Sequence, residues 1–390
     1  MAALSVLITN MVLLGRSGTE TYVRDLAVAL RQRGHHPEVY SPRTGKISRE
    51  IRAAGIPVRE RLSELTDRPD IIHGHHNLPT MSVLLRFPGV PAVFVCHSRG
   101  FWADAPPAFP RIRRYVAVDD LCRERLLSEH AIPERLVRVV PNSVDLGRFK
   151  PRGPLPDRPR RALLFSNYAN EHTHLPVVRE ACARMGLALD VIGSGVHNVC
   201  DHPETVLGGF DIVFAKARCA LEAMAVGAAV VLCGVEGTGP LVRSDDFTAL
   251  RRLNFGRGTL IDPVTADKLV AEVKRYDPGD AARVSARVRA EAGLDLMVTE
   301  LLATYRDALD DPTNGDHDIA AAEALATAEY LQALEPPLFA FFAADDKIMH
   351  LEAEVRRLAS ELAGFGAERK PPASRWSVRE LLGLGRSGPD

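Results

Sequence analysis

Histidines end two short apolar segments in the first quarter of the chain. His73, His75 and His76 close one segment, and His97 closes the next. Ligands bind beyond the carboxyl ends of the strands in open α/β sheets, so these side chains are candidates for contacting a ligand. We expect no metal site, because this histidine spacing on a strand end suits a metal poorly and no carboxylate-bearing helix motif accompanies it. Structural histidines are the alternative, although for His97 a substrate contact is favoured.

A glycine-bearing loop precedes the first helical pattern. It contains Gly15 and Gly18 and leads into Glu20. Backbone N–H groups in such a loop can approach an anion or a sugar, and the positive end of the helix dipole attracts negative charge. The loop lacks the lysine of a Walker sequence and the glycine spacing of a dinucleotide site. An ordinary tight turn is the alternative interpretation.

Two cations stand beside a later helix start. Lys216 and Arg218 follow a strand pattern, and Glu222 lies further into the helical segment. Positive charge and the helix dipole together could bind a diphosphate here. A lone Glu222 among Ala, Leu and Met is costly to bury without partners, so ligand hydroxyls would explain it. Exposure of Glu222 to solvent is the alternative.

Alternating strand and helix patterns position these residues. Strand patterns occupy 4–9, 38–41, 70–74, 92–97, 115–118 and 137–141, with a helix over 18–33. A proline-rich linker at 150–161 is followed by strands at 162–167, 188–193, 211–215 and 229–233 and by helices near 174–185 and 219–226. This alternation predicts parallel βαβ units in doubly wound sheets. We expect one α/β domain over 1–150, a second over 151–310 that is closed by helices from 265 to 309, and a helical extension over 311–390.

Composition excludes several classes of protein. The 390 residues are 46% hydrophobic and 25% charged, which suits a globular protein of more than one domain. A net charge of −1 argues against a nucleic-acid binder, and the six cysteines include no C-x-x-C pair. The chain shows neither a signal peptide nor a long apolar run, so a cytoplasmic location is expected.

The last part of the chain carries a coiled-coil pattern. Ile348, Leu351, Val355, Leu358 and Leu362 step by three and four residues over about two heptads. Packing of this helix on its own chain and a homodimer contact are both open. The amphipathic tail over 374–382 suits either a peripheral contact with a membrane surface or a disordered end.

Four segments together resemble glycosyltransferase family 4, a class of retaining enzymes with the GT-B fold. The segments are 15–22, 69–75, 137–145 and 221–231, in the family's order across about residues 4–310. Ser143 replaces a usual glycine and Ala229 a usual proline. The tail also resembles a sequence that follows coiled coils in bacterial polysaccharide glycosyltransferases, which points to polysaccharide biosynthesis.

The resemblance implies two Rossmann-like domains facing a cleft, with a nucleotide-sugar donor held mainly by the second domain and an acceptor mainly by the first. It implies that Glu222 binds the donor ribose and that His97 lies against the donor sugar. Gly15 and Gly18 would line the donor phosphate and the acceptor side. The other expected donor contacts are Asn167, Val206, Leu207, Thr238 and Gly239, and the expected acceptor-side contacts are Glu20, His75 and His76.

Two departures from the family bear on catalysis. Phe214 stands where the family has a glutamate that contacts the donor sugar, and residues 165–172 lack the Arg and Lys that usually bind the diphosphate. We expect Lys216 and Arg218 to replace that missing pair. With His97, they form the expected catalytic set.

The favoured function is therefore metal-independent transfer of a sugar, with retention, from a nucleotide donor to a glycan, lipid-linked or small-molecule acceptor. The enzyme would need no cofactor besides the donor. A GT-B enzyme with other chemistry, such as a sugar-nucleotide epimerase, is one alternative. A glycan-binding or scaffolding pseudoenzyme is the other, because Phe214 and the missing cation pair favour it.

Overall fold

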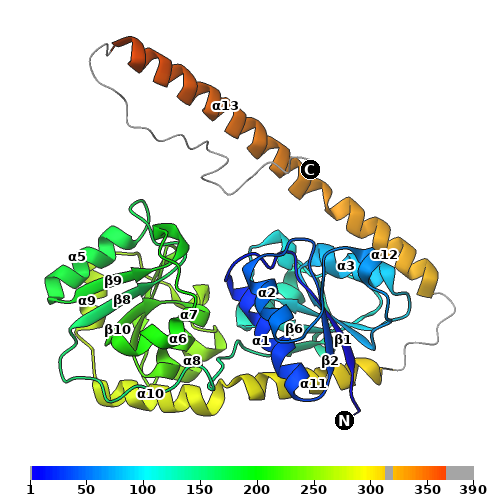
Figure 1. Ribbon diagram of the computed structural model, residues 1–390, viewed down its shortest axis with the longest axis horizontal. Coiled ribbons are helices and arrows are strands. Elements are labelled where there is room, and N and C mark those ends of the chain that lie inside the picture. Colours follow the sequence, from blue (N-terminus) through cyan, green and yellow to red (C-terminus); the bar gives the residue numbers. More distant parts are fainter. Residues whose placement is uncertain (1, 312–318, 366–390) are drawn as a thin grey trace. The chain divides into compact units, whose positions relative to one another are not determined.

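The computed structural model describes residues 2–311 and 319–365 of the chain (Figure 1). The chain divides into two compact units, Met1–Ile319 and Ala320–Asp390. The expected tail over 374–382 and the side chain of Leu362 lie outside what is described.

A seven-stranded parallel sheet forms the first half of unit 1. Its strand order is β3-β2-β1-β4-β5-β6-β7. Successive strands are added on one side of β1 up to β3 and on its other side from β4 onward. In open α/β sheets, ligands bind beyond the carboxyl ends of the strands at such a switch point, which here lies between β1 and β4. The strands are β1 (Ser5–Thr9), β2 (His36–Tyr40), β3 (Val58–Arg59), β4 (Ile71–His75), β5 (Ala92–Cys96), β6 (Ile112–Ala117) and β7 (Val137–Val139), and the helices are α1 (Gly18–Gln32), α2 (Lys46–Ala53), α3 (Asn77–Arg86) and α4 (Asp120–Glu124).

A second sheet of five strands follows the proline-rich segment. Its order is β12-β11-β10-β8-β9, and only the edge strand β12 is antiparallel to its neighbour. The strands are β8 (Arg161–Phe165), β9 (Ala188–Ile192), β10 (Ile212–Ala215), β11 (Ala229–Gly234) and β12 (Gly237–Leu241), and the helices are α5 (Leu175–Met185), α6 (Pro203–Val206), α7 (Ala217–Val226), α8 (Phe247–Arg252), α9 (Ala266–Val273) and α10 (Pro278–Glu291).

Helices cover both faces of the second sheet. Val213 packs with α7 and α10 on one face, whereas Ile212 and Phe214 pack with α5 and α9 on the other. Apolar side chains on both sides of a strand are typical of a parallel sheet between helical layers. The α/β fold with two Rossmann-like sheets is therefore confirmed.

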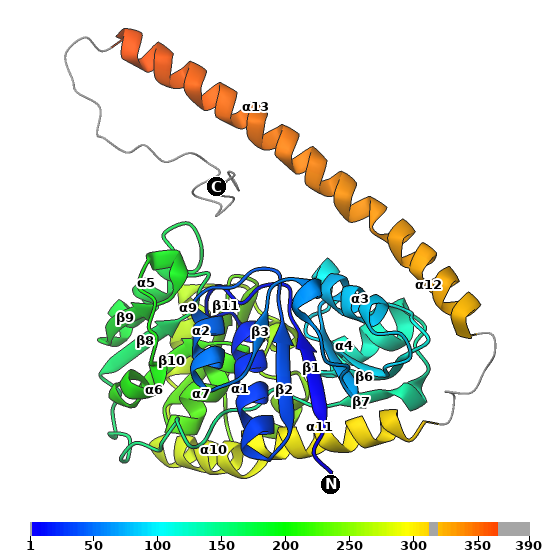
Figure 2. The ribbon, with the colours of Figure 1, turned by 45° about the vertical axis from the view of Figure 1, so that its right-hand side comes forward.

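The chain crosses between the sheets twice, and the two crossings lie side by side. The Val144 N–H donates to the Ala292 carbonyl at 2.9 Å, and the Leu294 N–H donates to the Val144 carbonyl at 3.0 Å. After the second crossing, α11 (Leu294–Leu309) packs against α1, β5 and β6 of the first sheet. Figure 2 shows α10 below the second sheet and α11 continuing below the first.

This placement of α11 corrects the expectation that the helices up to residue 309 all close the second domain. The buried Tyr305 hydroxyl contacts His73 Nδ1 at 2.8 Å, and Arg138 of β7 pairs with Asp307 at 2.6 Å. The apolar face of α11 was read correctly, but periodicity does not say which sheet such a face covers.

The part of unit 2 that the structure describes contains α12, which begins at the unit boundary (Ile319–Ala333), and α13 (Glu335–Phe365). Many large apolar side chains of α13 are exposed to solvent. Within residues 2–311 and 319–365, no helix has the length and apolar composition needed to span a bilayer.

Candidate functional site

A small cavity of about 110 Å³ lies where the two sheets face each other. The first sheet contributes Gly18 at the start of α1, and the second contributes Glu222 of α7 together with the loops after β8 and β9. The cavity is therefore at the carboxyl ends of parallel strands from both sheets. The residues that line it include Gly18, Phe165, Asn167, Ile192, Gly193, Val199, Arg218 and Glu222.

Glu20 shapes the loop that borders this cavity. Its carboxylate accepts hydrogen bonds from the N–H groups of Gly15, at 2.9 Å, and Ser17, at 2.7 Å. Ser17 in turn caps α1, which completes a capping box. The carboxylate of Glu20 is therefore bonded to its own loop, and it holds the backbone that presents Gly15 and Gly18.

Arg218 joins the two sheets through buried carboxylates. Its Nε donates to Glu222 at 2.9 Å, and its guanidinium pairs with Asp25 of α1. Burial raises the pKa of Glu222 against the lowering effect of Arg218. Burial also favours a raised pKa for Asp25, but Arg218 and Arg24 hold that pKa below its usual value. Arg218 therefore neutralises the carboxylate expected to bind the ribose.

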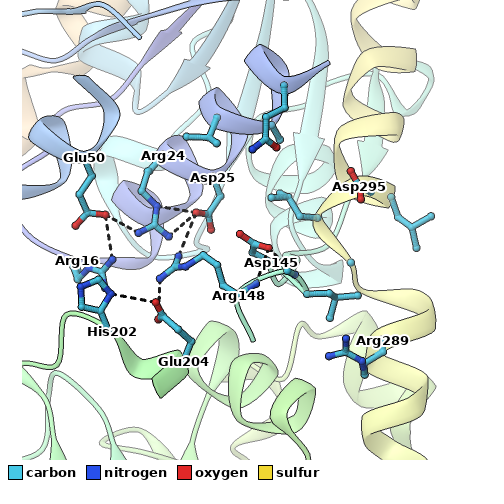
Figure 3. Close-up of a pocket in the computed structure, with 18 of the residues that line it drawn as sticks. Arg16, Arg24, Asp25, Glu50, Asp145, Arg148, His202, Glu204, Arg289 and Asp295 are labelled. Carbon is cyan, nitrogen blue, oxygen red and sulfur yellow. Dashed lines mark hydrogen bonds and ion pairs between the residues drawn. The ribbon is translucent and has the colours of Figure 1, made fainter. Parts of the chain in front are cut away.

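A larger cavity of about 830 Å³ lies beside the two crossings, and Figure 3 shows its charged lining. Arg24 bridges Asp25 and Glu50, at 2.6 Å and 2.8 Å. Arg148, at the first crossing, pairs with Glu204 of α6 at 2.9 Å. Arg148 also lies 3.9 Å from Asp25, so Arg148, like Arg218, connects α1 with a helix of the second half of unit 1.

Histidines gather at the ends of β4 and β5, as the sequence predicted. His75 Nδ1 and His97 Nε2 lie 2.6 Å apart, and the ring of Tyr22 makes T-shaped contacts with both rings. Burial, reinforced by His76 and His73, lowers the pKa of His97 to about 3. Burial likewise lowers the pKa of His73 to about 3. These rings are therefore neutral near pH 7.

His76 has a defined tautomer. Its Nδ1 accepts a hydrogen bond from the Met11 N–H at 3.2 Å, so the ring proton is on Nε2, which faces Asp104 Oδ1 at 3.8 Å. Burial lowers the pKa of His76 to about 4 and raises that of Asp104 to about 6. A polar pair in a desolvated setting at a strand end can bind or orient sugar hydroxyls.

Lys216 lies apart from the small cavity, at the N-terminus of α7. Its ammonium pairs with Glu236 of the β11–β12 turn and lies 5.6 Å from the ring centre of Tyr168. Its side chain is 21% exposed. A ligand at the α7 N-terminus would compete with Glu236 for this cation.

Of the remaining predicted donor contacts, one lines the small cavity and the other four do not. Asn167 lines the cavity and accepts a hydrogen bond from the Ser194 N–H at 3.2 Å. Leu207 is fully buried in the core beside α7, so it cannot contact a nucleotide in this cavity, and Val206 is not among the lining residues. Thr238 and Gly239 are on edge strand β12, where Thr238 exchanges backbone hydrogen bonds with Asp262, and they do not line the cavity either.

Sequence reasoning missed the charged residues that connect the sheets, above all Asp25 and Arg148. Asp25 is 6% exposed on a helix face shared with Leu26 and Tyr22. The cost of burying a charge among apolar residues, which singled out Glu222, would have singled out Asp25 as well.

Comparison with known proteins supports the family suggested by these features. Residues 16–148 match the family model described as Glycosyltransferase Family 4. The predicted resemblance to this family is confirmed. No curated protein matches the chain.

Solved structures extend the glycosyltransferase likeness to the fold of both sheets. A glycosyltransferase from Rickettsia africae is 16% identical, with a TM-score of 0.61 over 80% of this chain and 100% of its own. The Anabaena HepE protein, solved in complex with UDP and glucose, is 14% identical, with a TM-score of 0.57 over 78% of this chain and 99% of its own. At these identities the likeness shows the GT-B fold.

Proposed function

We propose that this protein is a retaining glycosyltransferase that moves a sugar from a nucleoside diphosphate donor to a hydroxyl acceptor on a glycan, lipid-linked or small molecule. The observation that carries the proposal is the buried carboxylate of Glu222 in a cavity between two GT-B sheets. A buried carboxylate facing a cavity suits recognition of vicinal ribose hydroxyls, because each hydroxyl donates a charge-assisted hydrogen bond.

The cavity walls suit the nucleoside. Phe165, Ile192 and Val199 are apolar and adjoin Asn167, which supplies polar atoms at the same edge. An apolar slot with a few polar groups is the usual environment of a bound base. In the proposed complex the base occupies this slot and the ribose lies toward Glu222.

The diphosphate would lie between the starts of α1 and α7. The backbone N–H groups at both helix starts favour an anion, and Lys216 at the α7 start adds a partly exposed positive charge. Arg218 adds positive potential while remaining bonded to Asp25 and Glu222. These groups would stabilise the leaving diphosphate without a metal.

In the proposed reaction the acceptor oxygen attacks the anomeric carbon on the face from which the diphosphate departs. The new C–O bond forms as the old C–O bond to phosphate breaks, and a phosphate oxygen receives the acceptor proton. The neutral ring of His97, which the fully buried His75 holds in place, would contact the sugar at the first sheet, beside the His76–Asp104 pair.

A thermal-shift panel of UDP, GDP, ADP and dTDP identifies the nucleotide. At about 100 times its dissociation constant, a ligand stabilises the folded state by about 2.7 kcal/mol. Nucleotide sugars that carry this nucleotide are then tested as donors. Release of the nucleoside diphosphate measures turnover, and NMR determines the anomeric configuration of the product. Inversion would reject the same-face reaction, and a rearranged sugar without transfer would indicate an epimerase.

Lys216→Met tests the diphosphate site. We expect turnover to fall at least about 100-fold with little change in folding stability, because Lys216 is partly exposed and its loss removes charge stabilisation of the leaving group. Lys268→Met is the matched control, because Lys268 of α9 is also partly exposed and also pairs with carboxylates, those of Asp262 and Glu272. Unchanged turnover of the Lys216 variant would remove this lysine from the mechanism.

A glycan-binding or scaffolding pseudoenzyme is the second candidate. It is favoured by the pairing of Lys216 and Arg218 with carboxylates and by Phe214, which packs in the core where the family has a donor-sugar contact. Nucleotide binding without transfer, across the full set of donors and acceptors, would support this candidate.

A further inference from the structure

Helix α13 presents an apolar seam in a strict heptad register. Phe341, Ile348 and Val355 occupy the a positions, and Leu351 and Leu358 occupy the d positions. The side chains of Phe341, Val355, Leu351 and Leu358 are 57%, 56%, 46% and 44% exposed. Four large apolar side chains on one helix face are therefore open to solvent, which marks a surface that binds another molecule.

The residue types of this seam favour two parallel strands. β-branched residues at a, here Ile348 and Val355, with leucine at d, here Leu351 and Leu358, are the combination that favours parallel dimers. The 31-residue length of α13 leaves room for three heptads after the prolines of its first turn.

Charges beside the seam are complementary in a parallel pair. Lys347 is at a g position and Glu352 at the following e position, which face each other between chains when two copies align in register. Each dimer would contain this pair twice. The described helix from 335 to 361 carries six acidic and three basic residues, and this negative balance disfavours an anionic membrane surface.

We propose that α13 docks onto α13 of a second copy of this chain as a parallel, in-register coiled coil, with Lys347 of each copy opposite Glu352 of the other. The seam then buries the exposed leucines, Val355 and Phe341 of both copies. The dimer would bring two glycosyltransferase units into one particle, independently of what either unit transfers.

Light scattering of the full chain after size exclusion tests the dimer. We expect a mass of twice the 42.6 kDa chain for the unmodified protein. Leu351→Asp should give the single-chain mass, whereas Met349→Asp, an equally drastic change at an exposed position off the seam, should remain a dimer. A monomeric unmodified protein, or dissociation by both variants alike, would overturn the proposal.

Exchanging the charges beside the seam tests the parallel register without changing the apolar residues of the coiled coil. Lys347→Glu and Glu352→Lys should each weaken self-association about tenfold, because like charges then face each other. Mixing the two variants should restore association, since both contacts become attractive in the mixed dimer. Failure of the two variants to associate on mixing would contradict the parallel register. If the unmodified protein bound anionic vesicles but did not self-associate, the partner of this helix would be a membrane surface and the proposal would be wrong.

Discussion

At the scale of single residues, the candidate site is built on charged side chains buried between the two sheets. Arg218 lies between Asp25 and Glu222, which come from different halves of unit 1. A ribose bound to Glu222 would share that carboxylate with Arg218. The arrangement therefore pre-orients Glu222, and in the proposed complex it would link donor binding to contact between the sheets.

Removing the cation from this cluster should destabilise the fold. We expect Arg218→Met to lower the free energy of unfolding by about 3 kcal/mol, because Asp25 and Glu222 would remain buried without their partner. Chemical denaturation measures the change. Arg252→Met removes an exposed ion pair with Asp120 and should cost less than about 1 kcal/mol. Equal losses of stability in the two variants would show that the buried ion pairs of Arg218 stabilise the fold no more than an exposed ion pair does.

The buried histidines predict a loss of stability in acid. The pKa of His73, lowered to about 3, lies below the ordinary 6.5, so its stabilising contribution is complete above 6.5 and is lost as pH falls toward 3. Asp104, with a pKa raised to about 6, acts in the opposite sense, losing its contribution as pH rises from 3.8 through 6.

His73→Gln isolates the contribution of one histidine. Between about pH 6 and pH 4, we expect the free energy of unfolding of the variant to depend on pH less steeply than that of the unmodified protein, by about 1.4 kcal/mol per pH unit. Denaturant titrations across this range measure both slopes. Parallel slopes would mean that His73 is protonated in the folded state.

Some of these residue contacts were predictable and others were not. The apolar sequence around Glu222 indicated that a buried carboxylate would need partners, and the structure provides Arg218. The second partner of Arg218 could not be inferred, because Asp25 is 193 positions away in the chain. Long-range pairing depends on how the sheets face each other, which local pattern does not encode.

At the scale of elements, close approach of two loops shapes the small cavity proposed to bind the nucleotide. A Cβ on Gly193 would lie 1.9 Å from the backbone carbonyl oxygen of Ser166. The loops after β8 and β9 therefore touch only because residue 193 has no side chain. Asn167 and Gly193, which both line the cavity, depend on this contact for their positions.

Gly193→Ala should separate these loops. We expect a loss of about 1–3 kcal/mol in stability from overpacking, together with weaker nucleotide binding. Denaturant titration and calorimetry measure the two effects. Gly153→Ala, where an added Cβ would meet nothing within 4 Å, is the control and should change neither. Full nucleotide affinity in the Gly193 variant would exclude the slot as the base site.

Element types followed from periodicity more reliably than element partners. Every strand from β1 to β11 except the two-residue β3 was predicted within a few residues, because buried parallel strands give continuous β-branched runs. Strand β12, which contains Gly237, Gly239 and Pro240, was missed because glycine and proline are poor strand residues. The partner sheet of α11 was misassigned because both sheets offer an apolar surface.

At the scale of the whole chain, the two sheets of unit 1 are joined by adjacent crossings and by ion pairs across the cavities. Asp25, Arg148 and Glu204 hold the halves together on the side that contains the larger cavity. Glu222 lines only the smaller cavity, so binding at Glu222 and binding beside the crossings can be distinguished by mutation.

The most direct test of the proposed donor site is calorimetry of the nucleoside diphosphate found in the thermal-shift panel binding to the Glu222→Gln and Glu204→Gln variants. We expect Glu222→Gln to raise the dissociation constant at least about tenfold, since a charged hydrogen-bond acceptor is lost, and Glu204→Gln to leave it nearly unchanged. Equal affinity of the Glu222 variant and the unmodified protein would contradict the donor site proposed for this protein.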